Sequence, residues 1–202
     1  MERIAIRTLP DGRLERLMPF HVCMEGMETA VLCRDEEDYD VMVKIIAVAA
    51  HRKNVILVIY AVVSNHCHVA TLALSQEDAR GYGDEIKRMY SMWFSRKYGE
   101  RKTMKGVSVS ALTLENDWHV RNALAYIPRN ALDNGCQVAT YPWSGYSAMF
   151  RSESDSWSLA VRAVAGLTKR EREAILHTGD DLSDVSWLLD GQDRLVPASI
   201  CD

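Results

Sequence analysis

The most apolar run of the chain, residues 55–63, leads directly into the tripeptide His66-Cys67-His68. This run consists mainly of β-branched residues, which predicts a buried strand. If the tripeptide begins the next strand, its two imidazoles lie on one face about 6.6 Å apart, and Cys67 packs on the opposite face as a small hydrophobe. Two such imidazoles can bind a divalent metal ion, but a site needs three or four ligands. On this spacing alone, a packed or polar pair of histidines is the more common explanation.

A candidate third ligand lies on a predicted helix about sixty residues further along the chain. Residues 118–130 show an apolar stripe with helical spacing, and a second face carries polar side chains that include His119, Tyr126 and Asn130. Tyr126 and Asn130 are four residues apart, so they are neighbours on successive turns. For His119, an exposed position at the helix start is the simpler interpretation.

Three blocks of sequence carry a resemblance to a known family: His66-Cys67-His68, the segment 126–130 (Tyr-Ile-Pro-Arg-Asn) and the segment 141–146 (Tyr-Pro-Trp-Ser-Gly-Tyr). In this order they resemble the single-tyrosine HUH transposases of the insertion-sequence 200 type, and most of all the REP-associated tyrosine transposases. The resemblance covers roughly residues 15–150. It implies cleavage and joining of single-stranded or hairpin DNA, with Tyr126 as the nucleophile. It further implies Mg²⁺ or Mn²⁺ bound by His66, His68 and Asn130.

The implied chemistry explains the residue types. A phenol has an unperturbed pKa of about 10 and is a poor nucleophile at neutral pH, so a metal ion has to stabilise charge on the attacked phosphate. Attack leaves a 5′-phosphotyrosine and a free 3′-hydroxyl, and a second hydroxyl can reverse the reaction without a nucleotide cofactor. The sequence contains no Walker-type phosphate loop. Two alternatives stay open: a descendant that binds hairpin DNA without cutting it, and an RNA-binding domain that shares only topology.

One departure from the family pattern affects the predicted site. Pro128 stands inside the helix and Ala131 follows Asn130, where relatives commonly have Tyr-Ile-His-Leu-Asn-Pro. Proline removes the hydrogen bond to the Leu124 carbonyl and kinks the helix axis. The kink turns Asn130 either toward the two histidines or away from them, and the sequence leaves both directions open.

The charge of the chain is acidic overall, with 24 basic and 28 acidic residues, yet residues 86–105 contain seven basic side chains and one acidic one. The aromatic residues of this stretch are expected to form the buried face of a helix. Its basic residues are expected to contact phosphates. We therefore predict a DNA-binding set that also includes the arginine beside the tyrosine block: Arg96, Lys97, Arg101, Lys102, Lys105 and Arg129.

The predicted elements follow one another in the order of an α+β, ferredoxin-like (RRM-like) sandwich, in which helices pack on an antiparallel sheet. We predict strands at 19–25, 55–63, 68–74 and 107–114, and helices at 35–50, 84–98 and 117–134. His21 falls in the first of these strands. A histidine in the core or at the sheet edge is the simplest interpretation of that position.

Composition changes after residue 150, which divides the chain into a catalytic domain (1–150) and a C-terminal helical extension (151–202). Thr168 and Glu171 form a capping box that begins a helix ending near Gly179, and a second short helix is predicted at 184–189. The acidic charge of this extension favours a small packed appendage over a DNA-binding helix-turn-helix.

Cysteine usage and hydropathy indicate where in the cell the chain is expected. Its five cysteines form no CxxC pair, so reduced thiols are expected, and no apolar run is long enough to span a membrane. We therefore expect a cytoplasmic protein without a membrane partner. The nearer family branch implies a monomer, with a homodimer as the alternative.

Overall fold

The computed structural model describes residues 5–26, 31–100, 103–150 and 160–201. Its centre is an antiparallel sheet in the order β5-β2-β4-β3. These strands are β2 (Leu14–Glu25), β3 (Ile56–Val62), β4 (His66–Ala73) and β5 (Ser108–Thr113). Helices α1 (Glu36–Lys53) and α2 (Gln76–Tyr98) connect them in the predicted strand-helix-strand-strand-helix-strand order. The predicted α+β, ferredoxin-like sandwich is confirmed.

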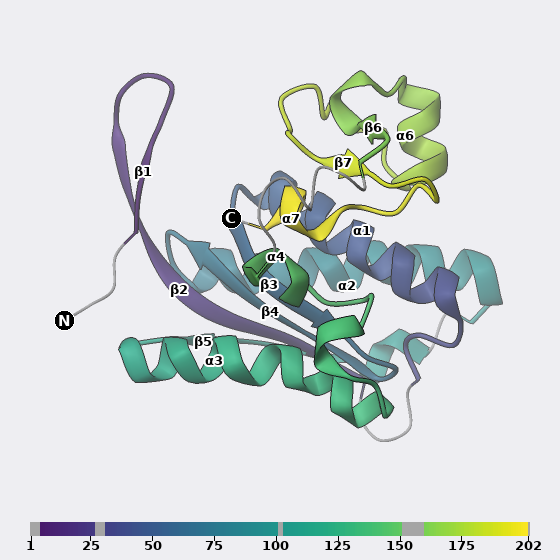
Figure 1. Ribbon diagram of the computed structural model, residues 1–202, viewed down its shortest axis with the longest axis horizontal. Coiled ribbons are helices and arrows are strands. Elements are labelled where there is room, and N and C mark those ends of the chain that lie inside the picture. Colours follow the sequence, from purple (N-terminus) through teal and green to yellow (C-terminus); the bar gives the residue numbers. More distant parts are fainter. Residues whose placement is uncertain (1–4, 27–30, 101–102, 151–159, 202) are drawn as a thin grey trace.

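The helices form two layers, one on each face of the sheet. Helices α1 and α2 lie above the sheet in Figure 1, and α3 (Asp117–Arg129) lies below it. The main core fills the space between the sheet and the first layer, and Cys67 is buried in this core. Strand alternation therefore turns Cys67 away from α3, as predicted, and leaves His66 and His68 on the α3 face.

Close packing of α2 on the sheet depends on one glycine. A Cβ atom at Gly83 would lie 2.6 Å from Val109 Cγ1 and 2.8 Å from Val22 Cγ1. Helix α2 begins at Gln76, eight residues before the predicted start, because the Ser75 side chain accepts a hydrogen bond from the Asp78 amide and caps it. Gly83 therefore lies inside α2 at a close contact with the sheet and does not belong to a loop that precedes the helix.

A β-hairpin precedes the predicted first strand. Strand β1 (Ala5–Thr8) pairs with the first half of β2, and the hairpin projects away from the sheet (Figure 1). Gly12 has φ 82° in its turn. The alternating pattern predicted this strand from Pro19 only, but β2 begins at Leu14 and continues through Pro19, which is paired with Leu72 of β4.

The helix that carries Tyr126 is shorter than predicted. The α-helix ends at Arg129, directly after Pro128, and the chain continues as the tighter 3₁₀ helix η2 (Asn130–Asn134). Proline cannot donate to the carbonyl four residues earlier, so the regular helix stops there. The remaining short elements of this region are η1 (Thr103–Gly106), η3 (Val138–Thr140) and α4 (Tyr146–Phe150).

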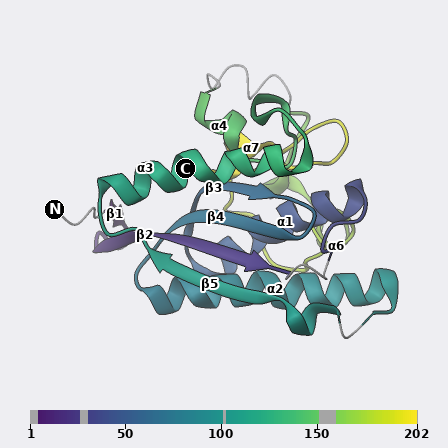
Figure 2. The same cartoon turned by 90° about the horizontal axis from the view of Figure 1, so that it is seen from below.

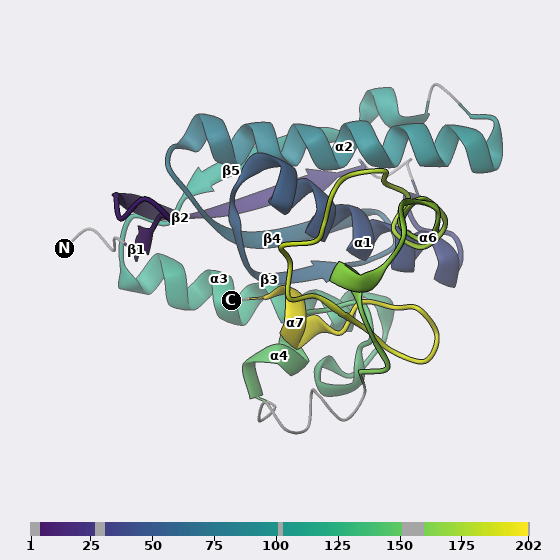
Figure 3. The same cartoon turned by 90° about the horizontal axis from the view of Figure 1, so that it is seen from above.

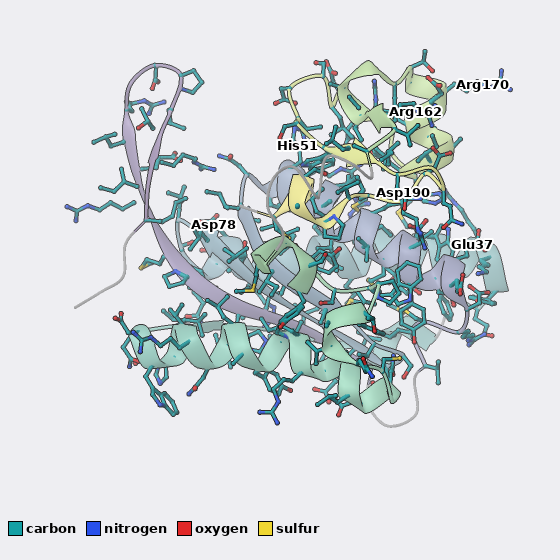
Figure 4. All side chains as sticks on the ribbon, in the orientation of Figure 1. Glu37, His51, Asp78, Arg162, Arg170 and Asp190 are labelled. Carbon is teal, nitrogen blue, oxygen red and sulfur yellow. The ribbon has the colours of Figure 1, made fainter. Side chains whose placement is uncertain are left out.

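Residues 160–201 pack over α1, on the side of the sheet away from α3 (Figures 1 and 3). They contain β6 (Arg162–Ala163), η4 (Val164–Gly166), α6 (Lys169–Ile175), β7 (Leu188–Leu189) and α7 (Pro197–Ile200). Arg52 of α1 forms an ion pair with Asp180, and His51, labelled in Figure 4, lies 3.2 Å from Asp184. Leucines of this segment belong to the main core.

Two sequence predictions for this segment are settled. The Thr168–Glu171 capping box is present, but α6 ends at Ile175 and His177 takes the left-handed conformation expected for Gly179. The helix predicted at 184–189 is wrong, because residues 184–187 are a turn and irregular chain and Leu188–Leu189 form β7, which pairs with β6. None of the five cysteines forms a disulfide, and none of the described helices is long and apolar enough to cross a bilayer.

Candidate functional site

The two histidines of the tripeptide lie on a central strand, which holds them from both sides. Strand β4 is bonded to β2 and to β3, so His66 stands beside Glu25 and His68 stands between Cys23 and Ala61. Directly paired residues of an antiparallel sheet share a face, and this face is the one that α3 covers in part. The register of the sheet thus aims both imidazoles at α3.

Helix α3 brings Tyr126 and Asn130 to these imidazoles. It is anchored by Ile127, which packs in a small apolar cluster with residues of β3 and β4. The Tyr126 hydroxyl lies 3.3 Å from His68 Nε2, and Asn130 Oδ1 lies 3.0 Å from His66 Nε2. Four candidate residues that are separated by up to 64 positions in the chain therefore meet in one place.

The orientation of the Asn130 amide is set by its own helix. Its Nδ2 group donates to the carbonyl oxygens of Tyr126 and Ile127, both at 3.1 Å. With both amide protons used in this way, Oδ1 is left to face His66. The change from α-helix to 3₁₀ helix after Pro128 therefore accompanies a turn of Asn130 toward the histidines, the direction that the sequence left open.

The surroundings of His66 fit a metal ion. Its Nδ1 lies 2.7 Å from Asn65 Oδ1 and its Nε2 lies 3.0 Å from Asn130 Oδ1, but a neutral imidazole carries only one N–H. One of these two contacts lacks a proton, and a cation between Nε2 and Oδ1 would satisfy both atoms. Two ligands at right angles around an ion with bonds of about 2.1 Å are about 3.0 Å apart.

His68 has a partner that the sequence analysis did not identify. His68 Nδ1 lies 3.0 Å from His21 Nε2, and the two ring centroids are 4.9 Å apart. An N–H donated from Nδ1 to His21 leaves the Nε2 lone pair of His68 toward Tyr126 and the metal-binding position. His21 was interpreted as a core or edge histidine. The signal that identifies it is its place on the α3-facing side of the strand paired with β4.

The electrostatics of the site favour neutral forms of His21 and His68 and a protonated Tyr126 phenol. Burial, followed by the neighbouring His21 and His66, lowers the pKa of His68 to about 3. Burial also lowers the pKa of His21. For Tyr126, partial burial and then the nearby Cys23 raise the phenol pKa above its ordinary value. Neutral imidazole is the form that binds metals, and a protonated phenol requires activation.

A metal ion at this place would have mixed ligands. Within the described part of the chain, no group of three or more His, Cys, Asp or Glu side chains is arranged to hold a metal. The third protein ligand of the histidine pair would thus be the Asn130 amide oxygen. The Asn130 amide oxygen is a ligand that suits Mg²⁺ and Mn²⁺, whereas imidazole nitrogens suit Zn²⁺, Fe²⁺, Ni²⁺ and Cu²⁺. Mg²⁺ commonly fills its remaining positions with water and substrate phosphate oxygens.

The predicted DNA-binding residues are dispersed over the molecule. Arg129 is exposed on α3 next to Asn130, and Arg96 and Lys105 are exposed at the far end of α2 and in η1. Arg101 and Lys102 lie outside the described residues. These exposed positions are compatible with phosphate contact and do not test it.

Lys97 has a different environment from the one predicted. Its ammonium lies 2.7 Å from Asp35 and 2.8 Å from both Glu37 and Asp38. Asp38 is completely buried, so Lys97 neutralises a carboxylate that would otherwise be buried without a counter-charge. The charge of Lys97 is therefore paired within the fold, and its predicted contact with phosphate stays a prediction.

A groove of about 780 Å³ adjoins Tyr126, between α3 and the open half of the sheet. Helix α3 packs mainly on β3 and β4, and in Figure 2 it lies on the β3 side of the sheet, away from β5. Its Tyr126 ring reaches β2, where it lies 6.1 Å from the His21 ring. The groove is lined by His21, Gln76, Leu112, Thr113, Leu114, Glu115, His119, Asn122, Ala123 and Tyr126. The sequence analysis did not predict it, because it forms between segments whose relative placement only the fold defines.

Comparison with known proteins supports the fold. No family model matches this sequence, and no curated protein sequence matches it. The chain is similar to the solved structure of a REP-associated tyrosine transposase bound to a REP hairpin, with a TM-score of 0.50 and 16% sequence identity. The match covers 64% of this chain and 76% of that chain. At this identity, the similarity establishes a shared α+β architecture.

Proposed function

We propose that this protein cleaves and rejoins single-stranded DNA through a covalent bond to Tyr126. The observation that carries this proposal is the meeting of the Tyr126 hydroxyl with the two imidazoles and the Asn130 oxygen. The similar fold of a tyrosine transposase bound to a REP hairpin supports DNA that contains a hairpin as the substrate class.

The residues of the site divide into a nucleophile and a phosphate-activating group. His66, His68 and Asn130 would hold Mg²⁺ or Mn²⁺, which when bound stabilises negative charge on the phosphate oxygens. Asn65 and His21 hold the outer nitrogen of each imidazole, so the inner nitrogens face the centre of the site. This arrangement is pre-organised by the sheet and requires no nucleotide cofactor.

The covalent step exchanges one phosphoester bond for another, so the number of phosphoester bonds does not change. The Tyr126 oxygen forms a bond to phosphorus as the bond to the 3′ oxygen of the preceding nucleotide breaks. The phenol loses its proton and the departing 3′ oxygen gains one. Attack by a 3′-hydroxyl on the 5′-phosphotyrosine reverses these changes and joins a strand. Exposure of half of the Tyr126 side chain leaves the phenol accessible to a strand.

Formation of a covalent protein–DNA adduct tests the proposal. Wild-type protein is incubated with Mn²⁺ and a pool of hairpin-bearing single-stranded oligonucleotides, and the adduct is detected on a denaturing gel. Tyr126→Phe is expected to lose all adduct and to keep its affinity for the oligonucleotides. Tyr146→Phe is the matched control, since it removes a phenolic oxygen from α4, outside the site. This control is expected to keep the adduct.

Other outcomes select the alternatives. Adduct formation by Tyr126→Phe would show that the nucleophile is assigned wrongly. A wild-type protein that binds hairpin DNA but forms no adduct with Mn²⁺ would identify a non-cleaving DNA-binding protein. Equal affinity for RNA and DNA strands without metal dependence would identify an RNA-binding domain.

A further inference from the structure

We propose that a pocket between α1, α2 and the bend after α6 binds phosphate, either as the free ion or as the phosphoryl group of a small monoester. The pocket has a volume of about 180 Å³, and three arginines and His177 line it. Helices α1 and α2 form the layer on the opposite side of the sheet from α3 (Figure 1). The inference goes beyond the chemistry proposed at Tyr126, because no residue of that site lines this pocket.

Helical spacing and the packing of α1 on α2 bring the cationic side chains together. Arg88, Met92 and Arg96 follow one another at intervals of four residues, so they lie along one face of α2. Arg52 comes from the last turn of α1, which packs against α2. His177 reaches the pocket from the bend after α6, where its backbone has φ 54°. Three segments of the chain therefore build one small basic site.

The charge of the lining favours an anion. None of the residues that line the pocket is Asp or Glu. Glu85 accepts hydrogen bonds from Arg52 and Arg88, and Asp180 accepts from Arg52, so these two guanidinium groups are held in place and partly neutralised from outside the lining. Arg96 is exposed and forms no ion pair within the part of the chain that the structure describes. Its charge is therefore available to a ligand.

One arginine also has a hydrogen-bond donor in a weak contact. Arg88 Nη1 lies 3.4 Å from Met92 Sδ, and a thioether sulfur is a weak acceptor. A phosphate oxygen in place of the sulfur would form a charge-assisted hydrogen bond, which is shorter and stronger. The planar guanidinium group matches the spacing of phosphate oxygens, so arginine suits this anion better than a point charge does.

Apolar side chains between the cations strengthen their attraction for an anion. Met89 and Trp93 belong to the lining, and Met89 is buried. Charges interact more strongly beside apolar walls than in water, because the effective dielectric constant is lower there. The pocket thus combines fixed guanidinium groups with a partly desolvated floor.

The titration of His177 agrees with a positive potential in the pocket. Burial and then Lys44 lower the pKa of His177 and Arg96 lowers it further, whereas Glu37 raises it. The His177 ring packs edge-on against Trp93, with the ring centroids 6.3 Å apart. A neutral imidazole carries one N–H, which it can donate to an oxyanion.

The size of the pocket limits the ligand to a small anion. Sites for drug-sized ligands commonly have volumes of roughly 300–1,000 Å³, and this pocket is smaller. It has room for a phosphoryl group but not for a whole nucleotide. A phosphate inside a DNA strand carries a sugar on each side, so a free phosphate ion or a terminal monoester fits better.

Isothermal titration of the full chain with inorganic phosphate tests the inference. A second titration uses glycerol 3-phosphate, and sodium chloride keeps the ionic strength constant in both, because salt screens exposed charges. Wild-type protein is expected to bind at one saturable site, and the tighter of the two probes distinguishes the free ion from a monoester. Arg96→Gln removes the unpaired charge, and His177→Gly removes the ring while glycine tolerates the positive φ. Each variant is expected to lower the affinity at least about tenfold, the equivalent of ~1.4 kcal/mol.

Matched controls separate this pocket from general attraction between charges. Arg80→Gln changes an exposed arginine earlier on α2, and Arg170→Gln changes an exposed arginine of α6, labelled in Figure 4; neither lines the pocket. Both controls are expected to bind phosphate as the wild type does, and thermal melting verifies that all four variants fold. The inference is overturned if the wild type shows no saturable binding, if Arg96→Gln and His177→Gly keep the wild-type affinity, or if the controls lose as much.

Two further results would place the anion elsewhere. If Tyr126→Phe loses phosphate affinity, the ion binds at the candidate site and the pocket is assigned wrongly. If the wild type binds neither probe but Arg96→Gln weakens binding of single-stranded oligonucleotides, Arg96 contacts DNA and the small-anion site is wrong. A wild-type protein that binds phosphate through Arg96 but forms no adduct with DNA leaves this inference in place and refutes only the proposed cleavage.

Discussion

Replacement of His21 by leucine tests the most specific feature of the candidate site, the contact between His21 and the metal-ligand candidate His68. His21 Nε2 lies 3.0 Å from His68 Nδ1, and only 7% of His68 is exposed. Leucine fills a similar space but offers no acceptor for the His68 N–H. The buried N–H then has no partner, and the imidazole is free to rotate or to change tautomer.

The expected size of the effect has two parts. A buried donor left without a partner costs about 1–3 kcal/mol of folding stability. Loss of the outer partner of a metal-binding histidine lowers metal affinity by about 10–100-fold, which corresponds to about 1.4–2.8 kcal/mol. Mn²⁺ affinity is therefore expected to fall by one to two orders of magnitude in His21→Leu. His21→Gln supplies an amide acceptor and is expected to recover part of this loss.

Isothermal titration with MnCl₂ in the absence of DNA measures this affinity directly. His119→Leu is the matched control, because His119 lines the groove beside Tyr126 and contacts neither His66 nor His68 in the structure. The control is expected to bind Mn²⁺ as the wild type does. Unchanged Mn²⁺ affinity in His21→Leu, or an equal loss in the control, would refute the role assigned to His21.

Three further predictions concern stability. Gly81→Ala is expected to raise the free energy of unfolding by about 1 kcal/mol through higher helix propensity, seen as a higher urea midpoint, because a Cβ there meets nothing within 4 Å. Gly83→Ala, in the same helix, is expected to lower the free energy of unfolding by about 1–3 kcal/mol, because the new Cβ overpacks against the valines of β2 and β5. This loss outweighs the gain in helix propensity, and a more stable variant would contradict the close contact. Hydrogen bonds from Arg88 and then Arg52 lower the pKa of Glu85 to about 2, below its unfolded value of about 4.3, so its stabilisation is present above that value and is lost as pH falls toward 2. Urea midpoints across this window should fall less steeply in Glu85→Gln, and equal slopes would argue against the ion pairs.

The sequence placed the two halves of the candidate site because both rest on local periodicity. Alternation along a strand puts His66 and His68 on one face, and helical spacing puts Tyr126 beside Asn130. The order of strands and helices then predicted the sandwich that brings these halves together. The direction of Asn130 could not be predicted, because it depends on hydrogen bonds from Asn130 Nδ2 to the Tyr126 and Ile127 carbonyls at the change to a 3₁₀ helix.

Features that depend on cross-strand register or on distant charges were beyond the sequence. His21 contacts His68 only because β2 pairs with β4 in one register. Lys97 was predicted to contact DNA from its basic neighbours, but its carboxylate partners Asp35 and Asp38 belong to the start of another helix. The hairpin that precedes Pro19 and the strand β7 were missed because their pairing partners lie outside the local pattern.

The two halves of the candidate site are anchored with unequal strength. The imidazoles belong to a central strand hydrogen-bonded along both edges, whereas α3 rests on the sheet mainly through the small cluster of Ile59, Ala61, Ala70 and Ile127. Elements with few buried apolar contacts open at lower free energy than the core does. Helix α3 is therefore expected to open more easily than strand β4. Local fluctuations of α3 can separate the Tyr126 phenol from the histidine pair while the sheet stays folded.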